Sequence, residues 1–285
     1  MPSLVLQSPA KLNLYLEVLN KRSDGFHNIV TLFERINLCD RITLKSTTSC
    51  RIQIHCNHPD VPLDSKNLVY KVARLLQEDF ALTQGVEIRI EKRIPVAAGL
   101  AGGSSNAATV LMGLNQLWNL KLSQAKLLFY ARKIGSDVAF FLYKTSWALG
   151  TQRGDKIKAL KLKRKLWHVV IVPRIKMYSW KVYGGLKLRL TKRNDNVNIL
   201  IHKLRKNNRT VLNRLLINDL EAVVIRFSPP ILRLKEELKS FNTQGVMVSG
   251  SGPAVFAVAE TKEDAKMIQK VFFKRFKQVF LAETL

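Results

Sequence analysis

The chain has 285 residues, of which 47% are hydrophobic and 24% charged, a composition typical of a globular protein and not of an intrinsically disordered one. Its 47 Lys and Arg outnumber its 21 Asp and Glu, so the formal net charge is +26, which points to anionic partners: nucleic acid, an anionic membrane surface or a phosphorylated small molecule. The three cysteines form neither an even disulfide framework nor a CxxC pair, which excludes a disulfide scaffold and a cysteine zinc site.

Targeting and membrane signals are not visible in the sequence. The first residues lack the basic segment and long apolar run of a secretory signal. No apolar stretch approaches the roughly 18 residues of a membrane-spanning helix. We therefore expect a cytoplasmic protein without a membrane partner, and the length predicts about two domains.

The basic excess is concentrated in the middle of the chain. Residues 151–215 hold 19 basic and only 2 acidic residues. The simplest interpretation is a solvated, lysine-rich surface, because no RNA-stacking pattern of aromatic residues accompanies the charge. A nucleic-acid partner is therefore not favoured, and the role of this segment stays open.

The first ninety residues indicate mainly strands. Apolar residues alternate from Leu12 to Val18, and further strand material runs from Ile29 to Leu44 after a turn at Asp24-Gly25. Residues 66–80 then predict a helix with one apolar face. Residues 86–90 alternate again and predict another strand.

The rest of the chain mixes helices and strands. A glycine-rich turn precedes an amphipathic helix from Ser104 to Trp118, and Ser123 predicts the N-cap of a helix over 124–133. Further strands are expected over 167–172, 245–248 and 254–259, and helices over 196–206, 210–226, 230–240 and 262–275. Because these elements do not alternate regularly, the predicted fold class is α+β.

The most specific stretch is PVAAGLAGGSSNAA at residues 95–108. A glycine-rich turn before a helix lets backbone N–H groups converge on an anion, and the helix N-terminus adds partial positive charge there. It is not a Walker A loop, because no GKS or GKT follows. The stretch predicts phosphate binding; the alternative is a small-residue turn with a serine N-cap that packs closely on a sheet.

This stretch resembles the ATP-phosphate loop of the GHMP kinases. Three more stretches resemble motifs of that family in the same order: SPAKLNL at 8–14, GSDVAFF at 135–141 and VSGSGP at 248–253. The resemblance covers nearly the whole chain. It implies a two-domain α+β fold, with a domain over 1–155 like the second domain of ribosomal protein S5 and a ferredoxin-like domain over 156–285.

The resemblance also implies an ATP-dependent small-molecule kinase whose acceptor is an alcohol. KRSDGFH at 21–27 and NDLE at 218–221 are similar to one branch of the family. That branch phosphorylates the 2-hydroxyl of a cytidine-diphosphate-linked methylerythritol in non-mevalonate isoprenoid precursor synthesis. The alternatives are a GHMP kinase for homoserine, a sugar or a mevalonate-like acid, and a basic nucleic-acid-binding protein. The expected state is a monomer or a homodimer.

The family motifs imply the catalytic and ATP-binding residues. Asp137 would accept the hydroxyl proton as general base, and Lys11 would neutralise developing charge beside it. Without the resemblance, Asp137 is as easily a turn or N-cap aspartate, and Lys11 a solvated strand residue. ATP is expected at Asn67, Pro95, Val96, Ala97, Ala98, Gly99, Leu100, Ala101, Gly102, Gly103, Ser104 and Ser105.

The same motifs imply the acceptor site. Asn13 would hydrogen-bond the diol, while Phe26, His27 and a second aromatic residue would hold cytosine; Tyr183 is the candidate, with Tyr178 or Trp180 as alternatives. The C-terminal glycine loop would add Gly250, Ser251 and Gly252. Mg²⁺ would arrive mainly with ATP, with the Ser105 hydroxyl as the candidate protein ligand.

Overall fold

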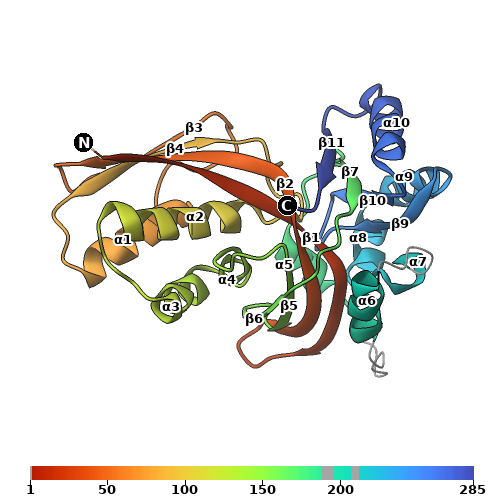
Figure 1. Cartoon of the computed structure of the whole chain (residues 1–285), viewed down its shortest axis with the longest axis horizontal. Coiled ribbons are helices and arrows are strands. Elements are labelled where there is room, and N and C mark those ends of the chain that lie inside the picture. The colour runs from red at the N-terminus through yellow and green to blue at the C-terminus, as the bar shows by residue number, and fades with distance from the viewer. Residues whose placement is uncertain (1, 188–195, 207–211) are drawn as a thin grey trace. The chain divides into compact units, whose positions relative to one another are not determined.

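The chain divides into two compact units in the computed structural model, which describes residues 2–187, 196–206 and 212–285 (Figure 1). Unit 1 comprises Met1–Ala10, Leu38–Val96 and Ala101–Lys144, and unit 2 comprises Lys11–Asn37, Ala97–Leu100 and Thr145–Leu285. Two long strands, β1 (Ser3–Lys21) and β2 (His27–Thr47), contribute residues to both units. Each unit is therefore discontinuous in sequence, and the division at residue 155 stays a prediction.

Unit 1 places helices along one face of a set of strands (Figure 1). β2 pairs antiparallel with β4 (Gly85–Glu91), and β4 pairs parallel with β3 (Ile52–Cys56). The helices are α1 (Leu68–Asp79), α2 (Gly102–Leu117), α3 (Gln124–Ile134) and α4 (Val138–Phe141). Alternate β4 residues, beginning with Val86 and Ile88, are fully buried, as the period of a half-buried strand requires.

Unit 2 contains the other ends of β1 and β2 and a separate antiparallel sheet. β2 pairs with β5 (Trp147–Gln152), which pairs with β6 (Lys156–Leu160), while β8 (Ile217–Asn218) joins β1 in parallel. The separate sheet has the order β11-β7-β10-β9. Its strands are β7 (Trp167–Ile171), β9 (Thr243–Val248), β10 (Val255–Ala259) and β11 (Val279–Glu283).

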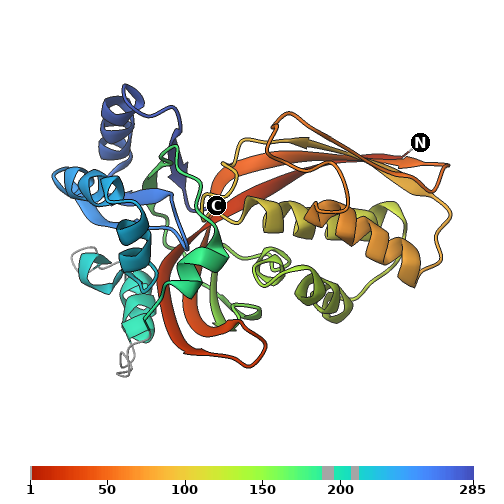
Figure 2. The same ribbon diagram turned by 180° about the vertical axis from the view of Figure 1, so that it is seen from behind.

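The helices of unit 2 are concentrated in its C-terminal part. They are α5 (Ser179–Gly184), α6 (Asn196–Arg205), α7 (Leu212–Leu215), α8 (Glu221–Phe227), α9 (Pro230–Lys239) and α10 (Lys262–Phe273). The opposite views of Figures 1 and 2 both show α9 and α10 beside the antiparallel sheet. This mixture of helices and strands confirms the predicted α+β class.

Two predicted helices have different limits in the structure. α2 begins at Gly102, two residues before the predicted start at Ser104, and its N-cap is Ala101, which has a φ of 54° and makes no side-chain cap bond. The helix predicted over 210–226 is wrong as one element, because Ile217 and Asn218 pair with β1 and separate α7 from α8. Residues 210 and 211 lie outside the described residues. The second difference comes from a tertiary contact that a local pattern does not contain.

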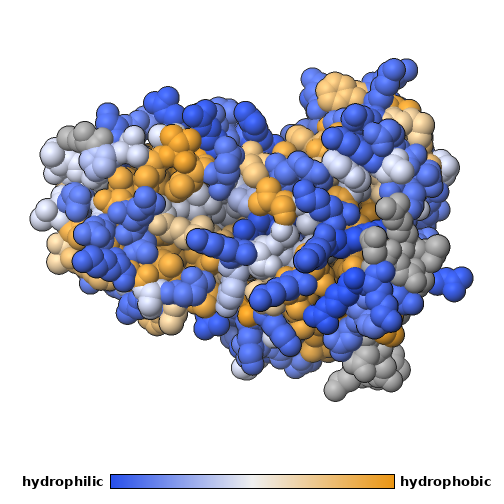
Figure 3. Space-filling model, in the orientation of Figure 1, coloured by the Kyte–Doolittle hydropathy of each residue, from blue (hydrophilic) through white to orange (hydrophobic). Residues whose placement is uncertain are grey.

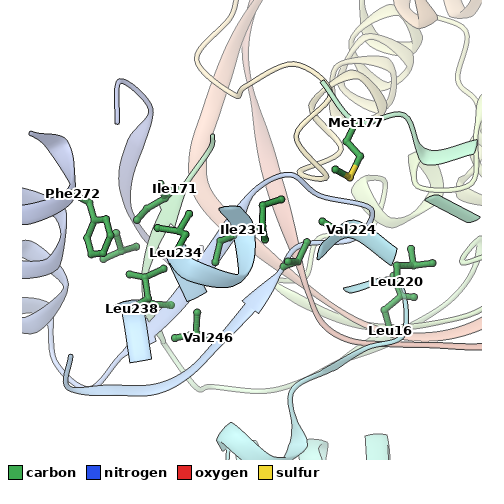
Figure 4. Close-up of a cluster of buried hydrophobic side chains, with 14 of the residues drawn as sticks. Leu16, Ile171, Met177, Leu220, Val224, Ile231, Leu234, Leu238, Val246 and Phe272 are labelled. Atoms are coloured by element: carbon green, nitrogen blue, oxygen red, sulfur yellow. The ribbon is translucent and has the colours of Figure 1, made fainter. Parts of the chain in front are cut away.

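The core of unit 2 is a cluster of buried apolar side chains from its antiparallel sheet, α8, α9, α10 and the end of β1 (Figure 4). Ile171 and Val246 come from strands, and Ile231, Leu238 and Phe272 come from helices. α10 contributes through the spacing of Ala265, Ile268 and Phe272 on one face.

We expect Phe272→Ala to lower the free energy of unfolding by about 3–5 kcal/mol, because removing a buried aromatic ring leaves a cavity in the core. Phe272 is 0% exposed, whereas the adjacent Phe273 is 62% exposed and provides the matched control as Phe273→Ala. Urea denaturation followed by circular dichroism measures both variants. Equal destabilisation by the two substitutions would contradict this account of the core.

Five lysines of the basic segment lie at the surface. Lys156, Lys158, Lys161, Lys163 and Lys165 are all exposed, and Figure 3 shows hydrophilic residues over much of the face turned to the viewer. This exposure agrees with a solvated, lysine-rich surface. Across the residues that the structure describes, no helix is both long and apolar enough to span a membrane.

Candidate active site

Lys11 and Asn13 lie on β1 in unit 2 and point to the same side of the strand. Both side chains are buried, and the Lys11 ammonium donates to Asn13 Oδ1. Asn13 Nδ2 donates to Thr31 Oγ1 at 2.7 Å, and that hydroxyl donates to the carbonyl of Tyr15 at 2.7 Å. The chain of bonds holds an amide and a cation in one orientation. Lys11 is thus not the solvated edge residue that its strand position alone would allow.

The first half of the glycine-rich loop packs against the same part of unit 2. The Lys11 backbone N–H donates to Leu100 O at 3.1 Å, and the Ala254 N–H donates to Ala98 O at 3.2 Å. Ser249 Oγ donates to Gly99 O at 3.0 Å. The N-terminal motif, residues 98–100 and the C-terminal glycine loop therefore meet, although more than 80 residues separate each from the next.

The C-terminal glycine loop, residues 249–252, lies against Lys11 and Asn13. A Cβ on Gly250 would lie 3.2 Å from Asn13 Oδ1 and 3.5 Å from Lys11 Nζ. Ser251 Oγ lies 2.8 Å from Ser179 Oγ at the start of α5, and the Gly252 N–H donates to Ser249 O at 2.9 Å. The loop thus connects the Lys11–Asn13 pair to the segment that holds the candidate aromatic residues.

Residues of the NDLE stretch hold the backbone of the C-terminal glycine loop through hydrogen bonds. Asn218 Nδ2 donates to Val248 O at 2.9 Å and to Gly250 O at 2.8 Å. Glu221 Oε2 accepts from the Val248 N–H at 2.9 Å. Asn218 and Ser249 are supporting residues to which the sequence analysis gave no role. Their only sequence signal is that they stand within or beside family-like motifs.

Of the three candidate aromatic residues, Tyr183 contacts His27. The two ring centroids are 5.2 Å apart with an angle of 28° between the planes, which is a stacked pair. Tyr178 and Trp180 are 50% and 71% exposed. Phe26 is exposed, and the Arg153 guanidinium lies 5.1 Å from its ring centroid. The aromatic pair that the structure forms is therefore His27–Tyr183.

The surroundings of His27 favour its neutral imidazole form. Partial burial, and secondarily the positive charge of Lys21, lower the pKa of His27 below its usual value of 6.5. A neutral imidazole has one N–H donor and one acceptor nitrogen. Such a group can read the polar edge of a nucleobase that has both donors and acceptors.

The second half of the glycine-rich loop begins α2 in unit 1. Gly103 is exposed and Ser104 half-buried, so both are open to a ligand, while Gly102 is buried. The first N–H groups of α2 have no partner within the helix, as at any helix N-terminus, and α2 is 16 residues long. Ser105 differs from Ser104, because it is fully buried and its Oγ accepts a bond of 2.8 Å from Ser8 Oγ.

Asp137 and Asn67 also lie in unit 1. Asp137 is half-buried directly before α4, and its carboxylate makes no cap bond to that helix. Asp137 thus occupies the turn and N-cap position of α4 that the alternative expected, without the side-chain bond of a capping residue, and its role as general base stays a prediction. Asn67 is the N-cap of α1, where Oδ1 accepts from the Val69 N–H at 3.0 Å and Nδ2 donates to Pro62 O. The predicted contact of Asn67 with ATP stays a prediction.

The donors available for a metal ion are few. Among the described residues no group of three or more His, Cys, Asp and Glu is placed to hold a metal. The buried Ser105 hydroxyl already has the Ser8 hydroxyl as partner. In unit 1, the backbone N–H groups that begin α2 are of the kind that bind phosphate at a helix N-terminus.

Family models match both parts of the chain. Residues 67–145 match the model described as "GHMP kinases N terminal domain". Residues 200–278 match the model described as "GHMP kinases C terminal". The matches include the glycine-rich loop, Asp137 and the C-terminal glycine loop.

Curated relatives are similar over almost the whole chain. A 4-diphosphocytidyl-2-C-methyl-D-erythritol kinase of Bacillus cytotoxicus is 40% identical over 264 residues, which cover 93% of this chain and 90% of that protein. A kinase of the same name from Shouchella clausii is 40% identical over 263 residues, covering 92% and 88%.

Solved structures show the same fold. A crystal structure of 4-(cytidine 5'-diphospho)-2C-methyl-D-erythritol kinase superposes with a TM-score of 0.84 at 30% identity and covers 98% of both chains. Homoserine kinase from Cytophaga hutchinsonii gives a TM-score of 0.79 at 21% identity, covering 99% of this chain and 94% of that one. At that lower identity the likeness concerns the fold alone.

Proposed function

The chain belongs to the GHMP kinase family, and from this premise we propose that it transfers the γ-phosphoryl group of ATP to the 2-hydroxyl of 4-diphosphocytidyl-2-C-methyl-D-erythritol, in the non-mevalonate route to isoprenoid precursors. Relatives about 40% identical over 93% of the chain are named as kinases of this acceptor. The observation that carries the proposal is the buried Lys11–Asn13 pair against both glycine loops, in the same unit as the stacked His27 and Tyr183. A homoserine or mevalonate acceptor would have no use for that aromatic pair.

Phosphoryl transfer requires positioning and neutralisation of charge more than covalent chemistry by the protein. We assign the phosphates of ATP to the glycine-rich loop, where the open residues Gly103 and Ser104 begin α2. Lys11 stabilises the charge that develops on the transferred group. Asp137 accepts the proton of the acceptor hydroxyl as that oxygen attacks the γ-phosphorus.

Recognition of the acceptor would fall to residues of unit 2. Asn13 is oriented by its bonds to Lys11 and Thr31, so its amide is held ready for the diol. The cytosine ring would stack on the His27–Tyr183 pair, and the neutral imidazole would bind the polar edge of the base. At 5.2 Å the two rings contact each other, so a base inserted between them would have to separate them.

Mg²⁺ when bound neutralises charge on the phosphates of ATP. The buried Ser105 hydroxyl is a poor fit for this cation, because its environment is closed and Ser8 donates to it. We therefore assign the cation to the phosphates themselves. The proposed partners are small molecules only, with neither membrane nor nucleic acid, and the proposed setting is the cytoplasm, with the enzyme as a monomer or a homodimer.

The test is ATP consumption by the purified chain with 4-diphosphocytidyl-2-C-methyl-D-erythritol, compared with homoserine, galactose and mevalonate. We expect ADP to form only with the cytidyl acceptor, and a phosphomonoester on its 2-hydroxyl by ³¹P NMR. Phosphorylation of another acceptor in preference to this one would overturn the substrate. Lack of ATP turnover with tight, salt-sensitive RNA binding would instead favour the nucleic-acid alternative.

Tyr183→Leu is expected to raise the KM for the cytidyl acceptor about 10- to 100-fold, because stacking of a base on an aromatic ring contributes about 1–3 kcal/mol. Trp180→Leu on the same helix is the matched control and should leave this KM unchanged, since Trp180 is 71% exposed. Steady-state kinetics at saturating ATP measure both variants. If Trp180→Leu had the larger effect, the assignment of the second aromatic residue would be wrong.

A further inference from the structure

A fully buried carboxylate lies in unit 1, outside every motif described above. Asp40 on β2 is 0% exposed. Its Oδ1 accepts from the backbone N–H groups of Arg93 and Ile94, each at 2.8 Å. Its Oδ2 accepts from Asn106 Nδ2 at 2.8 Å and from the Lys92 ammonium, whose side chain is 4% exposed. Four donors thus converge on one carboxylate.

The partners of Asp40 stand on both sides of the glycine-rich loop. Arg93 and Ile94 directly precede Pro95, and Asn106 directly follows Ser105. Asp40, which belongs to a third segment of the chain, therefore connects the residues before the loop to the helix after it. The Lys92 ammonium extends the link, because a Cβ on Gly102 would lie 3.0 Å from Lys92 Nζ.

A second branch of the network reaches the helix start itself. Asn106 Nδ2 also donates to Ser8 Oγ at 2.9 Å, and Ser8 Oγ donates to Ser105 Oγ at 2.8 Å. Ser8, Ser105 and Asn106 are all buried. Hydrogen bonds to a buried charged group are shorter and stronger than neutral ones, and a network with every member satisfied is rigid.

The loop between these anchors has a backbone that needs external support. Ala97 and Ala101 have φ values of 53° and 54°, in the left-handed region that residues with a Cβ rarely adopt. Such conformations persist only where the surroundings determine them. A phosphate cradle also has to be formed before the ligand binds, because donors that reorganise at each turnover contribute less to catalysis.

We propose that Asp40 is a positioning residue for ATP, which acts by clamping the two ends of the glycine-rich loop through Ile94 and Asn106. This inference rests on the proposed function, because it assigns the ligand of that loop. Asp40 itself touches no phosphate. Its effect on ATP is transmitted by the backbone of residues 95–105, whereas binding of the cytidyl acceptor by unit 2 does not depend on it.

Asp40→Asn tests the clamp with little change of shape. The amide oxygen can still accept from Arg93 and Ile94, but the new NH₂ group faces two donors, Asn106 Nδ2 and Lys92 Nζ, and the helix side of the clamp is lost. We expect the Kd of a non-hydrolysable ATP analogue to rise about 10- to 100-fold. The Kd of CDP, which probes the acceptor site, should stay within about twofold. Glu91→Gln is the matched control. It also removes one negative charge, from the residue next to Lys92, but Glu91 belongs to an exposed pair with Arg41, so neither Kd should change.

The outcomes separate the inference from the proposed function. If the wild-type chain does not bind the ATP analogue, the proposed function fails. If the wild type binds it and Asp40→Asn binds it equally well, or loses both ligands to the same extent, the inference is wrong and the function stands. Thermal unfolding checks that Asp40→Asn folds. If it does not, Asn106→Ala takes its place, because it keeps the Asp40–Lys92 pair and Ala favours helix. The inference then requires the Kd of the ATP analogue to rise at least about threefold while the Kd of CDP stays unchanged.

Discussion

Asp137→Asn is expected to reduce kcat about 10²- to 10⁴-fold, the contribution typical of a general base. Asn has nearly the same shape as Asp but cannot take a proton at neutral pH. Because Asp137 is only half-buried and Asn has nearly its shape, the substitution should leave the fold intact. Single-turnover phosphorylation of the cytidyl acceptor, with ATP and acceptor both saturating, measures the chemical step directly.

The control for Asp137→Asn is Glu78→Gln, which removes one charge from the same unit. Glu78 is exposed on α1 and pairs with Arg74 at 2.6 Å, so its loss should leave kcat unchanged. The Kd values for ATP and acceptor in Asp137→Asn should remain within about twofold of the wild type. A kcat in Asp137→Asn close to that of the wild type would show that another group receives the proton.

Gly99→Ala is expected to raise the KM for ATP about 100-fold and to lower the thermal midpoint. Gly99 has a φ of +79°, and a Cβ there would lie 2.1 Å from Ser249 O, an impossible contact with backbone. A residue with a Cβ costs about 1–2 kcal/mol in the left-handed region before any clash. The loop would have to move away from Ser249, and a displacement of about 1 Å in a positioning element can cost about 10²-fold in rate.

Gly184→Ala is the matched control for this substitution. A Cβ on Gly184, the last residue of α5, meets nothing within 4 Å. We therefore expect wild-type KM values and an unchanged thermal midpoint. Differential scanning calorimetry and kinetics with varied ATP measure both variants. A Gly99→Ala enzyme with normal ATP affinity would mean that the close approach to Ser249 O is not needed for the cradle.

Local patterns identified much of the fold before any contact was known. The apolar face of residues 66–80 predicted α1, and Ser123 was expected as the N-cap of α3, where its side chain indeed accepts from the Lys126 N–H. The turn at Asp24-Gly25 is present, with Gly25 at a φ of +83°. These features depend on residues within a few positions of one another, which is why the sequence is sufficient for them.

Contacts between distant segments explain what the sequence analysis missed. Ile217 and Asn218 break a helix-like pattern because they pair with Tyr15 and Leu16, about 200 residues earlier in the chain. Asp40 stands in a strand with no unusual neighbours in sequence, yet its carboxylate binds segments 52 and more residues away. Tyr183 was already the candidate in the sequence, with Tyr178 and Trp180 as alternatives, and the structure adds the contact of its ring with His27.

The sequence by itself determined the α+β class and, through its ordered motifs, the kinase family, and it predicted phosphate binding by residues 95–108. The tertiary structure decided which residues support those motifs: Asn218 and Ser249 beside the glycine loops, Tyr183 beside His27, and Asp40 between the two ends of the glycine-rich loop. The physical reason is that a motif encodes chemistry and local backbone geometry, whereas a hydrogen bond or a stacked pair requires two segments to be brought to within a few ångströms by the packing of the whole unit.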